Sequence, residues 1–249
     1  MTTGDLPLRG HAVIVTGSSS GIGAASARAF ARLGAGVLVN SARSVEAGEA
    51  VAASLPDASY VQGDITDPDV PGRLVTAALE RWGRLDTLVN NAGTTAVIPH
   101  HDVAAASVDV WRRIFEVNVF ATWAMSVAAL PALGDGEGGS IVNVASVAGV
   151  RPTGSSIPYA ASKAALNHMT ALLAKVVGPG VRVNAVAPGL VDTPWTEDWG
   201  TIREVVQQVA PLRRSGQPED VAEVVVDLAR AAYVTGQVVV VDGGLTLAT

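Results

Sequence analysis

The feature that most constrains the fold is a short apolar run followed at once by a glycine-rich turn and a helical stretch. Residues 11–16 are mostly β-branched and predict a buried strand. The turn Gly17-Ser-Ser-Ser-Gly21-Ile-Gly23 comes next, and the alanine-rich residues 24–33 predict a helix. Glycine lets backbone N–H groups approach a phosphate closely, and the positive end of a helix dipole attracts the same group. The turn is therefore either a phosphate-binding loop or a plain structural turn.

The same alternation of short apolar runs and helical stretches continues along the chain. It predicts parallel strands joined by helical crossovers, with ligands bound outside the carboxyl ends of the strands, where the polar clusters of this chain fall. We expect one α/β domain over residues 1–249, a doubly wound sheet of about seven parallel strands with helices on both faces. Further strands are expected at 37–40, 59–64, 85–89, 139–146, 181–186 and 237–241, helices at 71–82, 107–133, 158–177 and 218–230, and a flexible segment at 194–210.

Composition narrows the classes of function. A chain of 249 residues with 49% hydrophobic content can bury one large core. The net charge of −6, with no basic cluster beyond 213–214, argues against a nucleic-acid partner. Apolar runs such as 238–241 are far shorter than a membrane span, and residues 1–5 do not start a signal peptide. The absence of cysteine excludes disulfides and thiolate metal sites. We expect a cytoplasmic protein without a membrane partner.

The end of the second predicted strand bears on which dinucleotide could bind. In dinucleotide-binding folds an acidic residue about 20 positions past the glycines holds the ribose 2′-hydroxyl. Here Asn40 stands in that neighbourhood, followed by Ser41 and Arg43. Without a carboxylate nothing repels a 2′-phosphate, and Arg43 with Ser41 could bind one. The alternative is that Arg43 caps a loop. We expect NADP, with NAD as the alternative.

Tyr159 and Lys163 lie four residues apart in a predicted helix, so their side chains leave one face together. A phenol titrates near ~10 and is a poor acid or base at neutral pH unless a fixed cation stabilises the phenolate. Of the 17 Lys and Arg residues, only Lys163 and Lys175 are lysines, so a lysine here is informative. The alternative is a surface lysine one turn after a half-buried tyrosine. Asn118, a poor helix former inside a long predicted helix, either distorts that helix, holds a water or is satisfied in packing.

Together these motifs resemble the short-chain dehydrogenase/reductase family over the full length of the chain, and in particular its 3-oxoacyl carrier-protein reductases. The resemblance implies a Rossmann-type fold in which Tyr159 is the general acid in reduction and the base in oxidation. Ser146 would donate to the same substrate oxygen. Lys163 would lower the pKa of Tyr159 and hold the nicotinamide ribose, and Asn118 would position a water. The motifs are Thr16-Gly17-x-x-x-Gly21-Ile22-Gly23, Asn90-Asn91-Ala92-Gly93, Asn118, Ser146, Tyr159-x-x-x-Lys163 and Pro188-Gly189.

The resemblance also implies the cofactor contacts. Thr16 would stabilise the glycine turn. Ser20 departs from relatives that prefer NADP, which often carry a basic residue at this position. The expected contacts are Gly17, Ser19, Gly21, Ile22 and Gly23 around the pyrophosphate and adenosine, Ser41 and Arg43 at the 2′-phosphate, Asp64 and Ile65 at the adenine, Asn91, Gly93, Tyr159 and Lys163 at the nicotinamide ribose, and Val191 and Thr193 at the carboxamide.

Substrate specificity is expected from three loops, 94–103, 147–157 and 190–212. Trp195 and Trp199 in the last loop offer apolar area, either for substrate or for packing of a lid. Arg151 could meet an anionic group or be a solvated loop residue. His100-His101 lacks the further ligands of a metal site, so we expect no catalytic metal.

The leading hypothesis is an NADP(H)-dependent reductase of ketones or 3-oxoacyl groups that also oxidises secondary alcohols. An NAD-dependent alcohol dehydrogenase, a non-catalytic dinucleotide sensor and, last, a sugar-nucleotide epimerase are the alternatives. Helices 107–133 and 158–177 often pair between subunits in this family, and the tail 238–249 is apolar, so the resemblance implies a homotetramer or a dimer.

Overall fold

The computed structural model describes residues 6–134 and 138–248. Its seven strands form one parallel sheet in the order β3-β2-β1-β4-β5-β6-β7, which confirms the predicted doubly wound, Rossmann-type fold. The strands are β1 (Ala12–Val15), β2 (Gly36–Ser41), β3 (Ala58–Gln62), β4 (Thr87–Asn90), β5 (Gly139–Val144), β6 (Val181–Pro188) and β7 (Val238–Val241).

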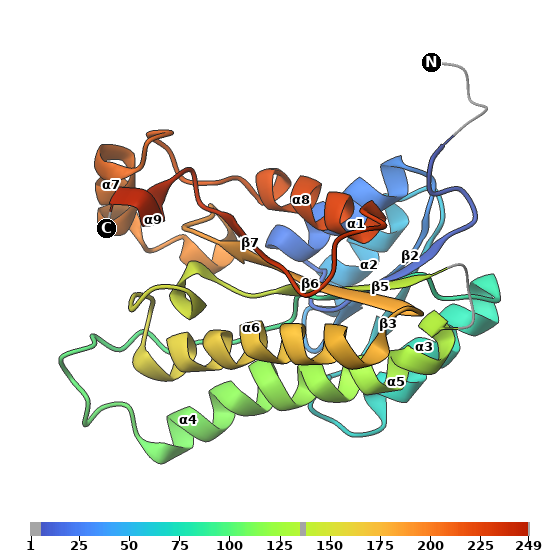
Figure 1. The fold of residues 1–249 in the computed structure, drawn as a ribbon, viewed down its shortest axis with the longest axis horizontal. Coiled ribbons are helices and arrows are strands. Elements are labelled where there is room, and N and C mark those ends of the chain that lie inside the picture. Colours follow the sequence, from blue (N-terminus) through green and yellow to red (C-terminus); the bar gives the residue numbers. More distant parts are fainter. Residues whose placement is uncertain (1–5, 135–137, 249) are drawn as a thin grey trace.

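Helices cover both faces of the sheet, as Figure 1 shows. Side chains alternate along each strand, so Val13 and Val15 of β1 pack into one apolar layer and Ile14 into the other. The first layer is covered by α1 (Gly21–Arg32), α2 (Val45–Ala53) and α8 (Pro218–Arg230), and the second by α3 (Val70–Trp82), α5 (Thr122–Gly134) and α6 (Ile157–Val177).

The strand order changes direction between β1 and β4, which are neighbours paired at Val15 and Val89. The chain runs from β1 outward through β2 and β3, and from β4 outward through β5 to β7. The loops that leave β1 and β4 therefore diverge and open a crevice at the carboxyl edge of the sheet, where such folds bind ligands.

The long helical stretch predicted at 107–133 is continuous but not regular. It consists of α4 (Val108–Phe115), a π-helical turn η1 (Glu116–Ala121) that contains Asn118, and α5. Of the alternatives considered for Asn118, the structure shows two: the helix is distorted at this residue, and its side chain is hydrogen-bonded within the packed protein. The stretch Val108–Gly134 is long and apolar enough to cross a membrane, with 39% of its apolar 18-residue window buried, but the core helix of a globular protein can have the same length and composition. Here α5 packs against α3, and α4 and η1 pack against α6.

The expectation of a flexible segment at 194–210 is wrong. A short 3₁₀ turn, η3 (Pro194–Thr196), is followed by α7 (Gly200–Val209), which lies beside the C-terminal α9 (Leu245–Ala248) (Figure 1). Pro194 and Gly200 are typical of loops, yet each lies at the start of a helical turn, where both are tolerated. The sequence patterns also did not predict the helix α2.

Candidate active site

The glycine turn after β1 adopts a conformation and a packing that only glycine allows. Gly17 and Gly21 have φ of 62° and 53°. A Cβ atom on Gly23 would lie 2.5 Å from both the Asn91 Nδ2 and the Gly17 carbonyl oxygen. Asn91 Nδ2 donates to the carbonyls of Thr16 and Gly17 at 3.0 and 2.9 Å, and the Thr16 hydroxyl accepts the N–H groups of Asn91 and Ala92. Thr16 therefore ties the start of the turn to the loop after β4, and Asn91 of that loop bonds to the turn itself.

The start of α1 fits a phosphate group. The helix begins at Gly21, directly at the turn, and among the described residues no side chain caps its first N–H groups, since Ser20 forms no capping hydrogen bond. Unpaired N–H groups at a helix N-terminus bind anions through hydrogen bonds and the helix dipole. The bare backbone of Gly17, Gly21 and Gly23 leaves room for such a group to approach.

At the end of β2, the side chains of Asn40 and Ser41 are buried, whereas that of Arg43 is exposed. The buried Asn40 amide donates to the carbonyls of Val61 and Gly63 at 3.1 and 3.0 Å. The Ser41 hydroxyl bonds to the Ser44 carbonyl at 3.0 Å and to a tyrosine hydroxyl on β3 at 2.8 Å. Arg43 is exposed, and it forms no ion pair within residues 6–134 or 138–248.

The adenine-side residues lie after β3. Asp64 is exposed, and its Oδ1 accepts the N–H and hydroxyl groups of Thr66 at 3.1 and 2.8 Å. Ile65 next to it is 5% exposed and packs into the second apolar layer. The hydrogen bonds of Asp64 therefore fix the loop that leaves β3.

Three of the four predicted catalytic residues meet where β5 ends against α6. Tyr159 and Lys163 lie on α6, and the Ser146 side chain, just beyond the end of β5, lies near enough to Tyr159 to affect the pKa of its phenol. The Lys163 Nζ lies 5.8 Å from the centre of the Tyr159 ring and donates to the Val144 carbonyl at 2.8 Å. The Ser146 hydroxyl also accepts the Ala148 N–H at 3.1 Å, which fixes its direction.

Asn118 joins this group from the π-helical turn. It is fully buried, and its Oδ1 accepts the Thr94 N–H at 2.8 Å. Its Nδ2 donates to the Thr94 carbonyl and to the Ser162 hydroxyl, each at 3.0 Å. A Cβ atom on Gly93 would lie 3.3 Å from the Asn118 Oδ1 and 3.7 Å from the Lys163 Nζ. Gly93 therefore borders both groups, and the wider helical turn holds the loop after β4 against α6.

Burial dominates the protonation equilibria here. It raises the pKa of Tyr159 above its ordinary value, against the smaller opposing effect of the Ser146 side chain. Burial also lowers the pKa of Lys163 to about 8. An effect of the Lys163 charge is not among the causes of this change in the pKa of Tyr159, and the ammonium group lies against the ring and a carbonyl. Tyr159 is protonated at neutral pH and suited to act as an acid.

The segment after β6 closes over this site. The Thr193 Cγ2 lies 3.2 Å from the position of a Cβ on Gly21, and the Trp195 Cη2 lies 3.8 Å from that on Gly93. The rings of Trp195 and Tyr159 meet edge to face with centroids 6.3 Å apart. The hollows of about 570 and 390 Å³ lie elsewhere, beside α3 and at the opposite edge of the sheet. Trp195 therefore lies against Tyr159 and near Gly93, and forms part of the wall of the candidate site.

The remaining candidate residues either lie apart from the group around Tyr159 or hold the loops next to it. Arg151 is exposed and donates to the carbonyl of its neighbour at 3.4 Å, which favours a solvated loop arginine. No group of three or more His, Asp or Glu side chains in the described part of the chain is placed to hold a metal ion, His100 included. The hydroxyls of Thr95 and Ser155, 2.5 Å apart, join two of the substrate loops, a contact that no spacing in the sequence indicates.

Comparison with known proteins identifies the family. The profile of a family described as Enoyl-(Acyl carrier protein) reductase matches residues 17–246. The chain is 57% identical over 237 residues to the granaticin polyketide synthase putative ketoacyl reductase 2 of Streptomyces violaceoruber, covering 94% of this chain and 95% of the relative. It is 38% identical over 250 residues to the 3-oxoacyl-[acyl-carrier-protein] reductase FabG of Thermotoga maritima, covering 96% and 99%.

A solved structure of a putative short-chain dehydrogenase/reductase from Burkholderia xenovorans matches with a TM-score of 0.89 at 36% identity, covering 95% of this chain and 98% of that one. The chain belongs to the short-chain dehydrogenase/reductase family. It is an oxidoreductase of that family acting on CH–OH or carbonyl groups, and the family implies an NAD(P) cofactor.

Proposed function

We propose that the protein is an NADP(H)-dependent ketoreductase whose substrates are 3-oxoacyl thioesters or related ketones. The observation that carries the proposal is the grouping of Ser146, Tyr159, Lys163 and Asn118 at the edge of the sheet that bears the glycine turn. The ketoacyl and 3-oxoacyl reductases among its relatives support the substrate class.

The chemistry follows from the protonation states. Bound NADPH supplies a hydride to the carbonyl carbon. Tyr159 gives its phenolic proton to the carbonyl oxygen, and the Ser146 hydroxyl donates a hydrogen bond to the same oxygen and stabilises the charge that develops there. Lys163, with a pKa of about 8, is charged at neutral pH and stabilises the phenolate that proton transfer leaves. Asn118 holds the loop at Thr94 so that the four groups stay together.

The proposed cofactor contacts follow the crevice. Gly21, Ile22 and Gly23 offer N–H groups to the pyrophosphate at the uncapped start of α1. Arg43 meets the 2′-phosphate, since it is an exposed charge just after β2 and forms no ion pair within residues 6–134 or 138–248. The remaining proposed contacts are Gly17, Ser19, Ser41, Asp64, Ile65, Asn91, Gly93, Tyr159, Lys163, Val191 and Thr193.

The cofactor preference is tested by titrating NADPH and NADH into the wild type and Arg43→Ala. An arginine–phosphate contact is charge-assisted, so we expect the Kd for NADPH to rise about 10- to 100-fold and that for NADH to stay unchanged. Arg230→Ala, at the opposite edge of the sheet, is the matched control and should change neither. Tighter binding of NADH, unaffected by Arg43→Ala, would move the proposal to an NAD-dependent alcohol dehydrogenase.

The reaction is tested with a panel of ketones, 3-oxoacyl thioesters and enoyl thioesters, the last because of the description of the matching family. We expect reduction of the keto group. A protein that binds NADPH but reduces no member of the panel would favour a dinucleotide sensor, and reduction of enoyl thioesters alone would refute the keto specificity.

Assembly into a homotetramer is also proposed. The outer surface of η1, α5 and α6 exposes large apolar side chains that a subunit contact would bury. Light scattering should give the mass of a tetramer, with a dimer as the alternative, and Trp123→Glu should lower it. A wild-type monomer at micromolar concentration would refute this proposal. The exposed side chains are Phe120, Trp123, Val127, Leu172 and Val176.

A further inference from the structure

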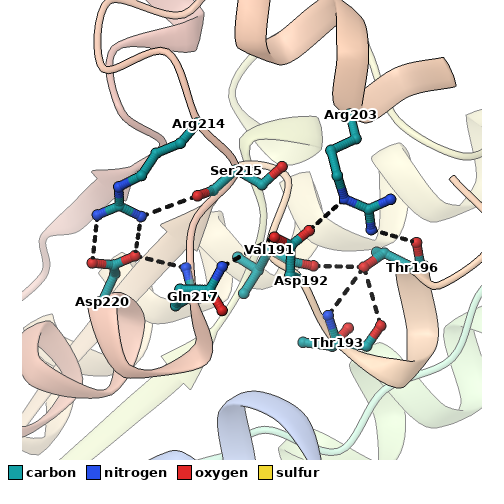
Figure 2. A network of polar contacts seen from close by, with 9 residues as sticks. All are labelled: Val191, Asp192, Thr193, Thr196, Arg203, Arg214, Ser215, Gln217 and Asp220. Carbon is teal, nitrogen blue, oxygen red and sulfur yellow. Dashed lines mark hydrogen bonds and ion pairs between the residues drawn. The ribbon is translucent and has the colours of Figure 1, made fainter. Parts of the chain in front are cut away.

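Two arginine–aspartate pairs lie side by side after β6, as Figure 2 shows. Arg203 of α7 donates from Nε to Asp192 Oδ1 at 2.7 Å. Arg214 pairs with Asp220 in the first turn of α8 through two hydrogen bonds of 2.5 and 2.8 Å. Gln217 joins the pairs, because its Nε2 donates to Asp192 Oδ2 at 3.0 Å and its N–H to Asp220 Oδ2 at 2.6 Å.

Arg203 binds both ends of the short segment 191–196. Besides the Asp192 carboxylate, its guanidinium binds the Thr196 carbonyl through Nη2 at 3.1 Å (Figure 2). Between these points the segment folds on itself, since the buried Thr196 hydroxyl donates to the Val191 carbonyl at 2.6 Å and accepts the Thr193 N–H at 3.2 Å. The segment 191–196 is thus a compact turn clamped by one side chain of α7.

The same turn presents two side chains to the active site. Thr193 packs on Gly21 of the glycine turn, and Trp195 packs on Tyr159 and beside Gly93. Any shift of the turn relative to α7 would therefore move the wall that faces the catalytic tyrosine. Within the described residues, the side chains of Arg203 and Asp192 form no hydrogen bond or ion pair with the adenosine side of the crevice, at the ends of β2 and β3.

The two ion pairs differ in the solvent exposure of their side chains and in the segments that they contact. The side chains of Arg203 and Asp192 are 26% and 33% exposed, against 51% for Arg214 and 36% for Asp220. Arg214 donates to its own neighbour's carbonyl and to Asp220, and within the described residues it has no hydrogen bond to the turn 191–196. Arg214 is therefore a matched control for a surface ion pair that does not clamp the turn.

We propose that Arg203 is a positioning residue: through Asp192 and Thr196 it fixes the turn 191–196 against the active site, and so sets how the nicotinamide half of the dinucleotide is held. The inference rests on the proposed function, because it requires that Val191 and Thr193 lie at the carboxamide. It predicts that loss of Arg203 weakens the binding of the nicotinamide half of the cofactor and leaves the binding of the adenosine half nearly unchanged.

The test compares the Kd of NADPH with that of adenosine 2′,5′-bisphosphate, which carries only the adenosine half, in Arg203→Gln, Arg203→Lys and Arg214→Gln proteins. A partly sheltered ion pair with one further hydrogen bond predicts an NADPH Kd about five- to tenfold higher in Arg203→Gln and a bisphosphate Kd within about twofold of wild type. Arg203→Lys should fall between, because lysine keeps the ion pair but not both contacts. Arg214→Gln should stay within about twofold of wild type for both ligands.

A second measurement needs no ligand. Hydrogen exchange of the amides in 191–196 should be faster in Arg203→Gln than in Arg214→Gln if Arg203 clamps the turn. An Arg203→Gln protein that binds NADPH as the wild type does, or that weakens both ligands equally, overturns this role and leaves the proposed function standing. A wild type that binds neither NADPH nor NADH overturns both. If the wild type prefers NADH, NADH and ADP take the places of the two ligands.

Discussion

Replacing Lys163 by methionine removes a buried ammonium group and keeps a flexible apolar stem of similar length. Burial lowers the pKa of Lys163 from 10.5 to about 8, so the folded protein holds the charged form less readily than the unfolded chain does. Below pH 8 the charge therefore costs folding free energy, and this cost disappears as the pH rises from 8 to 10.5. The wild type should gain stability relative to Lys163→Met over that range.

The size of the effect follows from the two pKa values. With 1.36 kcal/mol per unit, the charge costs roughly 3 kcal/mol at pH 7 and about 1 kcal/mol at pH 10. Methionine also loses the hydrogen bond to the Val144 carbonyl, which costs about 1 kcal/mol at every pH. The net change at pH 7 is the sum of opposing effects, so its change with pH is the diagnostic quantity.

The assay is urea unfolding of both proteins at equal concentration at pH 7 and pH 10. We expect the difference in unfolding free energy to shift by about 2 kcal/mol in favour of the wild type as the pH rises. Lys175→Met, which replaces the other lysine on the exposed side of the same helix, is the control and should show no such shift. A difference between wild type and Lys163→Met that stays constant from pH 7 to pH 10 would refute the account of Lys163 as a buried cation.

Two substitutions and one control test the packing of the sheet, one at the glycine turn and one at the opposite edge of the sheet. Gly23→Ala would place a Cβ atom 2.5 Å from the backbone of the glycine turn. We expect this substitution to weaken NADPH binding at least about tenfold and to lower the free energy of unfolding by about 1–3 kcal/mol. The control Gly72→Ala in α3, with nothing within 4 Å of its new Cβ, should raise stability slightly. Arg182→Met removes three hydrogen bonds to carbonyls at the C-terminal end of α8 and should lower stability by about 2 kcal/mol without changing the Kd for NADPH, because it lies at the opposite edge of the sheet. Thermal melts measure the changes in stability, and NADPH titrations measure the changes in Kd. Normal NADPH binding by Gly23→Ala would contradict the role of Gly23 in the turn, and weakened NADPH binding by Arg182→Met would contradict a purely structural role of Arg182.

The sheet could be predicted from the sequence because each strand and each crossover leaves a local signal, such as the β-branched run before Gly17. The helix α7 could not, since Pro194 and Gly200 are typical of loops. Its apolar residues are spaced as on a helix, but of these only Val206 is buried. The ion pair between Arg203 and Asp192 that ties this helix down joins residues 11 positions apart, and no spacing rule indicates it.

For the site, the poor helix propensity of Asn118 made distortion of the helix one of three alternatives, and the group of Ser146, Tyr159 and Lys163 followed from resemblance to a family. The direction of the pKa change at Tyr159 did not follow from either. It depends on how completely the ring is buried, which is a property of the packed structure and not of the four-residue spacing. The inward orientation of Ser41 depends in the same way on a tyrosine from the neighbouring strand.

The central claim is that Tyr159 is the acid of an NADPH-dependent keto reduction. It is tested most directly by the rate of NADPH oxidation on addition of a 3-oxoacyl thioester to the wild type, Tyr159→Phe and the control Tyr233→Phe, whose ring is exposed. The account predicts turnover by the wild type and the control, and a kcat at least about 100-fold lower for Tyr159→Phe with the Kd for NADPH unchanged. Equal rates for Tyr159→Phe and the wild type would contradict it.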